Sequence, residues 1–459
     1  MSLNRSPVDR SRPMLEAYGT GLTTAEILWA SRGWGPLRIF TKERSQPEGS
    51  YVQKSDWQTA GLVRLSGLQE GGLYTVRAVN RAGRTWDVPL HLPRRIRNGS
   101  DNTFLGYAVA QDPQGRLYAT TKGANDGTQW YLRRSEDGGQ NWVRMYIYST
   151  IHNRIYYYDN KLFGTTWAGW PSQRDKLFYT PVQPDYDGPT IAVMADPMFN
   201  PDPSSNRVDI YPWAFEPRGP FWIVGADGNW IPGGGETAFN ESNCNNRIYY
   251  TNDYWHTRQS MIAPPGGGIY TKHVHAICWN PESQCYFISI GDHIRRNYLV
   301  SPDLQQWQQV ADGIYHNTGQ ASGASIGITW LPDGSFLAGN DDVRSGHITR
   351  FRANGTHEIV LRLPEWHAAM VWDIWACDDG EVWATFRQDG STTRIGSVMA
   401  SLDWGKSWRT VFRAPLGTFT PAFIGGCHET RRLHGEHIII DQGALYPTSP
   451  AWVWMRFRQ

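Results

Sequence analysis

The stretch RSEDGGQNWVRMY, residues 134–146, decides the fold, because it returns in similar form as ASLDWGKSWRTVF at residues 400–412. Both copies have the spacing Ser-x-Asp-x-Gly-x-x-Trp. A partial third copy, SPDLQQW at residues 301–307, keeps the Ser, Asp and Trp but has no Gly. A repeated motif that contains turn residues indicates an architecture built from similar units.

The residue types in this motif suit a rigid turn between two strands. Ser and Asp side chains hydrogen-bond backbone groups of their own turn, and Gly tolerates a positive φ angle. The Trp begins the next strand and can pack on a neighbouring hairpin. We therefore predict a structural role for Ser135, Asp137, Gly139, Trp142, Ser401, Asp403, Gly405 and Trp408.

Hairpin patterns follow one another after residue 102, as in YAVAQDPQGRLYATT at 107–121 and ITWLPDGSFLAG at 328–339. They recur at intervals of ~40–50 residues, the size of one four-stranded propeller blade. Residues 103–459 are thus predicted to form an all-β propeller. Counting hairpin pairs gives seven blades, the last completed by a strand from elsewhere in the chain. Six blades is the alternative, because residues 154–167 lack the Ser–Asp motif.

Residues 14–92 have a different pattern. The segment LVRLSGLQEGGLYTVRAVNRAG, residues 62–83, alternates apolar and polar positions around a Gly turn, which is typical of antiparallel strands. Its order of Leu68, Tyr74, Val76, Ala78, Asn80 and Gly83 resembles the tyrosine-corner strand of fibronectin type III domains. The resemblance implies a β-sandwich over 14–92, between a tail at 1–13 and a linker at 93–102.

The Ser–Asp motif resembles the Asp-box, or BNR repeat, of sialidase-like β-propellers. The resemblance implies that the boxes lie on the face opposite the functional site. Sialidases also carry a Phe/Tyr-Arg-Ile-Pro signature before the first box. The nearest match here, PRRIRNG at 93–99, differs from it. No catalytic residue is therefore carried over from that family, and catalysis stays open.

If the boxes mark one face, the connections between the second and third strands, and between blades, lie on the other face. Histidines recur where innermost strands begin, where they could bind a metal, act as a general base or satisfy their own backbone. Trp, Arg and Asp beside them suit carbohydrate. We predict a ligand-binding face that contains His152, Trp170, Trp230, His275, Asp292, Arg295, His316, Asp342 and Trp366.

Charge and composition exclude several classes of protein. The formal net charge of +1 suggests no nucleic-acid partner. No apolar run approaches ~20 residues, so no membrane insertion is expected, and the first residues lack the apolar region of a signal peptide. Cys278 and Cys285 flank a predicted turn and could face each other, either as free thiols or as a pair. No cofactor is expected.

These observations favour a glycan-recognition protein that is extracellular or part of a virion. A fibronectin-like module joined to a Trp-rich propeller, without a signal peptide, fits a bacteriophage tail or fibre protein. Such a protein would bind a cell-surface glycan or polysaccharide and contact other virion proteins through its N-terminal domain. The alternatives are a polysaccharide-cleaving hydrolase or lyase, and a purely structural virion protein.

Overall fold

The structure, a computed structural model, describes eighteen stretches of the chain. They are residues 12–95, 106–122, 130–148, 151–167, 176–181, 209–227, 247–252, 259–262, 273–291, 297–312, 327–340, 346–352, 354–363, 370–387, 396–413, 421–425, 436–441 and 452–455. These stretches are all-β and contain no α-helix, only one 3-10 turn at Glu48–Ser50. No described helix is long and apolar enough to cross a membrane.

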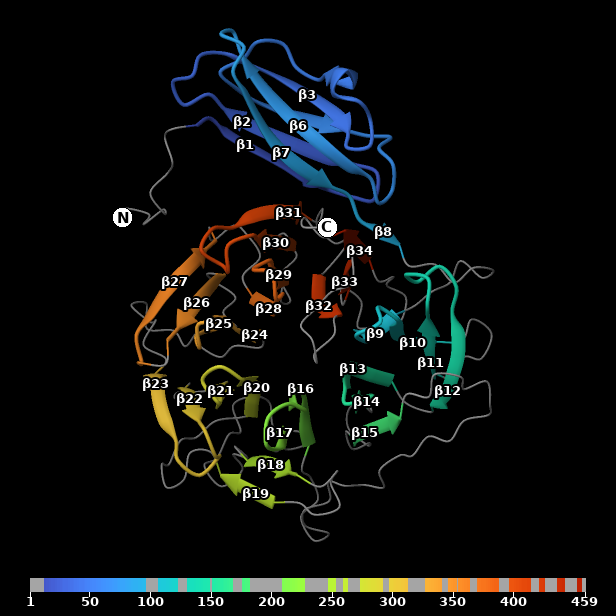
Figure 1. Cartoon of the computed structure of the whole chain (residues 1–459), viewed down its shortest axis with the longest axis vertical. Coiled ribbons are helices and arrows are strands. Elements are labelled where there is room, and N and C mark those ends of the chain that lie inside the picture. Colours follow the sequence, from blue (N-terminus) through green and yellow to red (C-terminus); the bar gives the residue numbers. More distant parts are fainter. Residues whose placement is uncertain are drawn as a thin grey trace, which may run out of the picture.

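The N-terminal part is a sandwich of two sheets (Figure 1). One sheet has the order β1 (Met14–Gly19), β2 (Ala25–Ala30), β5 (Ala60–Leu65). The other has the order β4 (Val52–Gln53), β3 (Leu37–Glu43), β6 (Leu73–Asn80), β7 (Thr85–His91). Burial alternates along β2 and β3, as expected for strands with one face in a core. That core includes Ile27, Trp29, Leu37, Ile39, Val76 and Ala78.

A tyrosine ties the sandwich at one corner. The backbone N–H of Gln69 donates to the Tyr74 hydroxyl at 2.8 Å, which fastens β6 to the turn before it. Gly72 leaves room for the ring, because a Cβ there would lie 2.7 Å from Tyr74 Cε2. This is the contact that the resemblance to a tyrosine corner predicts.

The remaining strands form successive antiparallel sheets around a central axis, as in a β-propeller (Figure 1). The first groups are β9 (Gly106–Gln111), β10 (Leu117–Lys122), β11 (Trp130–Ser135) and β12 (Val143–Tyr148); β13 (Ile151–Tyr158), β14 (Lys161–Trp167) and β15 (Lys176–Pro181); and β16 (Asp209–Glu216), β17 (Trp222–Asp227), β18 (Arg247–Thr251) and β19 (Gln259–Ile262). The next are β20 (His273–Asn280), β21 (Cys285–Gly291), β22 (Asn297–Ser301) and β23 (Gln308–Asp312); and β24 (Ile328–Trp330), β25 (Phe336–Gly339), β26 (His347–Phe351) and β27 (His357–Arg362). The last are β28 (Met370–Ala376), β29 (Val382–Arg387), β30 (Ser397–Ser401) and β31 (Arg409–Arg413); and β32 (Pro421–Gly425), β33 (Glu436–Asp441) and β34 (Trp452–Met455) with β8 (Arg94–Arg95).

Aromatic rings fill the space between neighbouring sheets of the ring. Phe287 of β21 stacks on Phe336 of β25 with ring centroids 4.6 Å apart. Tyr298 of β22 lies 4.6 Å from Phe351 of β26. Adjacent sheets therefore pack face to face, and large aromatic side chains supply much of the buried apolar area.

Two strand pairings join the N-terminal part to the ring. Strand β8, inside the predicted linker, pairs antiparallel with β34 and completes the last sheet. Strand β1 pairs parallel with β31 where Gly19 meets Phe412, so one sheet continues from the ring into the sandwich. A Cβ on Gly19 would lie 3.1 Å from the Phe412 ring, so glycine permits this close approach. The sandwich is thus docked on the ring.

Side chains support both junctions. Arg413 donates to the Tyr18 hydroxyl at 3.1 Å and stacks on its ring, and that hydroxyl donates to Glu26 at 3.0 Å. Burial raises the pKa of Tyr18 to about 12, so the hydroxyl keeps its proton. On the other side, the Arg94 guanidinium donates to the carbonyl of Gly138 at 2.6 Å.

The two cysteines that flank the turn at 281–284 are free, as the favoured interpretation of the sequence had them, and they do not face each other. Cys278 is buried opposite Phe287, and Cys285 lies opposite Asn280 at the end of the same hairpin. Both are free thiols. The strand register, which offsets them by two positions, explains why they do not face each other.

Candidate ligand-binding face of the ring

The Ser–Asp turns, defined as residues 135–142, 301–307 and 401–408, share one hydrogen-bond pattern. In the first, the Ser135 hydroxyl donates to Asp137 at 2.8 Å and accepts the Gly139 N–H at 2.9 Å. The Trp142 indole N–H then donates to the Gly139 carbonyl at 2.9 Å. The turn at 401–408 makes the same bonds within 0.1 Å of these lengths. Ser401 bonds Asp403 and the Gly405 N–H, and the Trp408 indole bonds the Gly405 carbonyl. Each motif residue therefore has a local structural role.

The aspartates of these turns are held in the ionised form. Burial raises the pKa of Asp137, but hydrogen bonds from the backbone and side chain of Asn141 and from Ser135 outweigh it, and the pKa falls to about 2. Hydrogen bonds lower the pKa of Asp303 and Asp403 in the same direction. A carboxylate that accepts several N–H bonds has a low pKa for this reason.

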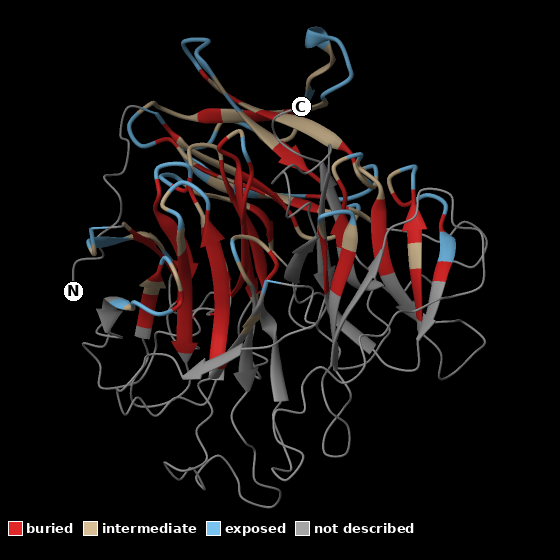
Figure 2. Ribbon diagram, turned by 60° about the horizontal axis from the view of Figure 1, so that its bottom comes forward, coloured by how far each residue is buried: buried red, intermediate tan, exposed pale blue. Residues whose placement is uncertain are grey.

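Buried acidic groups hold other turns at the same end of the strands. Glu216, 2% exposed, accepts two hydrogen bonds from the Arg218 guanidinium at 2.7 and 2.6 Å. It also accepts the backbone N–H of Trp279 from the next sheet at 2.9 Å. The turns described above, at the end of the ring called the turn end, are thus held by hydrogen bonds to their own backbone or to a neighbouring strand; Figure 2 shows the described turns coloured by burial.

The other end of the strands, called the opposite end, is where the sequence predicts the ligand-binding residues. Strand β21 runs away from the turn at 281–284 and ends at Gly291, and β22 runs back from Asn297 to a Ser–Asp turn. Strand β21 thus ends, and β22 begins, at the opposite end, on either side of Asp292 and Arg295 in the sequence. The other predicted residues that fall between strands are Trp170, Trp230, His316, Asp342 and Trp366. All seven of these residues lie outside the described part of the chain.

The two other predicted residues lie on innermost strands near the opposite end. His152 is in β13, where its backbone pairs with Thr166. His275 is in β20 and is 1% exposed, so its imidazole lies beneath the surface. Among the side chains that the structure describes, no three His, Cys, Asp or Glu groups gather to hold a metal ion.

A β-bulge recurs on the innermost strands near this end. The register of β20 shifts between Val274 and Ala276, at His275, and that of β28 shifts between Val371 and Asp373, at Trp372. Strand β13 shifts next to His152. Bulges re-aim side chains and are common at barrel rims and beside functional sites. Strands β20 and β28 thus share a bulge that redirects one side chain close to the opposite end.

The bulge in β28 creates a stacked pair that the sequence analysis missed. The Arg387 guanidinium of β29 lies 4.2 Å from the centroid of the Trp372 ring. Beside the bulge, the Asp373 N–H donates to the Thr385 hydroxyl at 3.1 Å, which replaces a ladder bond. The polar Asp inside the apolar strand MVWDIWA is the signal that could have indicated an irregular strand. Trp372 is 6% exposed, so the pair is largely buried and leaves little ring surface for a ligand.

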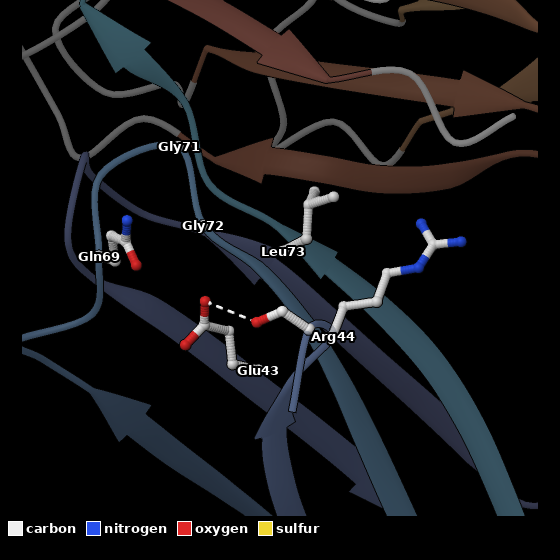
Figure 3. A pocket seen from close by; sticks show the side chains of 7 residues that line it. Glu43, Arg44, Gln69, Gly71, Gly72 and Leu73 are labelled. Carbon is white, nitrogen blue, oxygen red and sulfur yellow. Dashed lines mark hydrogen bonds between the residues drawn. The ribbon is translucent and has the colours of Figure 1, made fainter. Parts of the chain in front are cut away.

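A separate hollow lies in the N-terminal sandwich (Figure 3) and has a volume of about 320 Å³. It is lined by Glu43, Arg44, Ser45, Gln69, Gly71, Gly72 and Leu73. The Glu43 carboxylate accepts the Ser45 hydroxyl at 3.0 Å, while the Arg44 guanidinium points away from it. With its one carboxylate already bonded, the hollow offers few convergent polar groups, and the opposite end of the ring stays the candidate site.

Comparisons with known proteins place the chain among distant structural relatives only. No protein-family profile and no curated protein matches the sequence. The extracellular domain of a putative hybrid two-component system from B. thetaiotaomicron has a TM-score of 0.48 at 10% identity, over 80% of this chain and 40% of that one. A protein from Lactobacillus plantarum has a TM-score of 0.46 at 10% identity, over 83% and 97% of the two chains. A protein of unknown function from Dyadobacter fermentans has a TM-score of 0.41 at 10% identity, over 79% and 99%. Likenesses at this level assign neither a family nor an activity.

Proposed function

We propose that the chain is a glycan-recognition protein that binds carbohydrate at the opposite end of a seven-bladed, sialidase-like propeller. The propeller follows a fibronectin type III-like domain. The protein acts outside the cell or on a virion. The blades are the strand groups that begin with β9, β13, β16, β20, β24, β28 and β32; the third and fourth groups are joined by a pairing of β17 with β20, and β8 closes the last group.

The segregation of the two ends of the ring carries the proposal. At the turn end, the Ser–Asp turns and Glu216 bond to their own backbone or to neighbouring sheets, which leaves them little capacity for a ligand. At the opposite end, β20 and β28 bulge, and the sequence between the strands there supplies Trp170, Trp230, Trp366 and Arg295. Flat aromatic rings beside guanidinium groups are what a site for sugar rings requires.

The test is a binding screen of the purified chain against bacterial capsular and O-antigen polysaccharides. We expect saturable retention on at least one of these polysaccharides. The retained polysaccharide is then examined by chromatography for cleavage products. Retention without products supports recognition. New reducing ends would instead indicate the hydrolase alternative, and unsaturated products would indicate the lyase alternative.

Variants locate the binding site on the ring. The double variant Trp170→Ala/Trp230→Ala should weaken binding by a few kcal/mol, because one aromatic anchor can contribute about 2 kcal/mol or more. The control is Tyr51→Ala, which removes a half-buried aromatic residue from the N-terminal sandwich outside any proposed binding surface. Unchanged affinity in the double variant, or an equal loss in the control, would contradict the site.

A further inference from the structure

One end of the N-terminal sandwich collects arginine and tryptophan side chains. In the register of β3 and β6, Leu37 pairs with Asn80, so the β2–β3 and β6–β7 turns lie together at this end. The bridge between Leu37 and Gln58 brings the segment before β5 to the same place. The side chains at this end, called the Arg–Trp tip, are Arg32, Trp34, Arg38, Trp57, Arg81, Arg84 and Trp86.

The tip is built by stacking. The Arg38 guanidinium lies 4.5 Å from the centroid of the Trp57 ring, and Arg81 lies 5.9 Å from the same ring. Arg84 lies 5.1 Å from the Trp34 ring. Trp34 in turn meets Trp86 edge to face, with centroids 5.3 Å apart. Stacking holds the planar guanidinium groups in fixed orientations.

Within the part of the chain that the structure describes, no carboxylate neutralises the charge of the tip. Among the described residues, none of its four arginines forms an ion pair with a carboxylate. Further along the same sheet, Arg77 shows the opposite arrangement, because it is paired with Glu48 and, at 2.7 Å, with Asp87. The contrast separates guanidinium groups that serve the fold from those that face outward.

The Arg38 side chain also lacks a hydrogen-bond partner among the described residues. Its Nε atom is buried and has no hydrogen-bond acceptor within the described part of the chain. The nearby Asp56 is exposed and accepts from Gln53 at 3.4 Å instead. The local surface is therefore cationic even though the whole chain has a net charge of only +1.

We propose that the Arg–Trp tip docks an acidic surface of a partner protein. Trp and Arg are the residues that dominate protein interfaces, and the guanidinium fork matches a carboxylate in a bidentate pair. The tip consists of two turns and a strand-flanking segment, whereas the hollow of the sandwich, lined by Glu43 and Leu73, lies at the other end. A projecting surface suits a flat partner better than a small glycan, which needs a concave site.

Within the described residues, the tip lies away from the contacts between the sandwich and the ring. The sandwich contacts the ring through Gly19 and Tyr18 at the end of β1 and through β8, which follows β7. The β6–β7 turn lies at the other end of β7, away from those contacts (Figure 1). The proposal therefore concerns a surface separate from the glycan-binding face and can fail without it.

The experiment measures binding of the full chain to immobilised poly-L-glutamate at two salt concentrations. We expect salt-sensitive binding that falls at least tenfold in Arg81→Glu/Arg84→Glu. The matched control is Arg144→Glu, which reverses the charge of an exposed arginine stacked 5.2 Å from Tyr131 on the ring. No binding to poly-L-glutamate, or the same loss in the control, overturns the proposal.

Two further measurements define the recognised chemistry. The variant Arg81→Lys/Arg84→Lys keeps the charge but removes the fork, so we expect it to lose at least threefold in affinity; unchanged affinity would overturn the stacked-fork mechanism. Tighter binding to heparin fragments or duplex DNA than to poly-L-glutamate would overturn the choice of a protein partner. Retention of polysaccharides by the charge-reversal variant should equal that of the parent, which separates this test from that of the glycan-binding face.

Discussion

The Ser–Asp turns at 401–408 and 301–307 make the same bonds with different residues at the critical position. In the first, Gly405 takes φ 79° and donates its N–H to Ser401 at 2.8 Å. In the second, Leu304 takes φ 63° and donates to Ser301, also at 2.8 Å. The turn at 301–307 is one residue shorter between its Ser and its Trp. The comparison shows that the turn conformation depends on these hydrogen bonds and does not require glycine at this position.

Burial explains how leucine holds a conformation that usually favours glycine. The left-handed conformation costs a residue with a Cβ roughly 1–2 kcal/mol. Leu304 is 0% exposed in a cluster with Leu299 and Ile288, and burying such a side chain contributes about 1.5–3 kcal/mol. The two terms are similar in size, so a buried leucine can replace glycine at this site.

The largest expected effect comes from truncating that leucine. Leu304→Ala should lower the free energy of unfolding by about 2–5 kcal/mol, because it removes buried contacts and keeps the strained φ angle. Leu304→Gly removes more atoms but relaxes the backbone, so we expect it to be about 1 kcal/mol less destabilising than Leu304→Ala. Urea unfolding of both variants tests this order, and the reverse order would show that backbone strain is negligible here.

A smaller effect is expected from adding a side chain at the glycine. A Cβ on Gly405 would lie 2.9 Å from Leu337 Cδ1, so Gly405→Ala should cost about 1–3 kcal/mol through strain and overpacking. The control is Gly355→Ala, where φ is 81° and no atom lies within 4 Å of the added Cβ. It should lower the free energy of unfolding only through backbone strain, without overpacking. An equal decrease in stability for both variants, measured by thermal unfolding, would mean that Leu337 moves away from the new Cβ without an energetic cost.

The serine substitutions test whether the two turns depend on the same bond. Ser401→Ala and Ser301→Ala each remove the acceptor of a backbone N–H, so each should cost about 1–2 kcal/mol. We expect losses within a few tenths of a kcal/mol of each other, measured by the same urea titration. A loss confined to Ser401→Ala would break the comparison, because the shorter turn would then not need its serine.

The smallest effect is a dependence on acid. The folded-state pKa of Asp137 is about 2, below its usual value of 3.8. Its hydrogen bonds therefore contribute stability that is present above about pH 3.8 and is lost as the pH falls through about 2. Asp137→Asn should flatten part of the melting-temperature profile between pH 4 and pH 2. A profile with the slope of the parent would assign the acid sensitivity to other carboxyl groups.

Local patterns carried most of what the sequence could predict. The all-β class, the turns around Asp137 and Asp403 and the bond of Tyr74 to its corner depend on residues close together in the chain. They are encoded by spacing and by short hydrogen bonds. The expectation that a strand from elsewhere completes the last sheet also agrees with the pairing of β8 and β34.

Features that depend on distant segments were not predictable from spacing. The pairing of Gly19 with Phe412 and the stack of Trp372 on Arg387 arise from packing and from a shift in strand register. Neither leaves a periodic signal in one sequence. The positive φ angle of Leu304 was not predicted, because a rule that requires glycine at such an angle does not consider side-chain burial.

The pairing of β8 with β34 sets the order in which the ring can be assembled. Arg94 and Val453 meet from opposite ends of the chain, so the last sheet is completed only after nearly every other segment has been synthesised and folded. Contacts with such large sequence separation form slowly, and until they form β34 has an unpaired edge that can recruit another chain. Folding yield during synthesis should therefore depend on how quickly this two-residue pairing forms, more than on the stability of any single sheet.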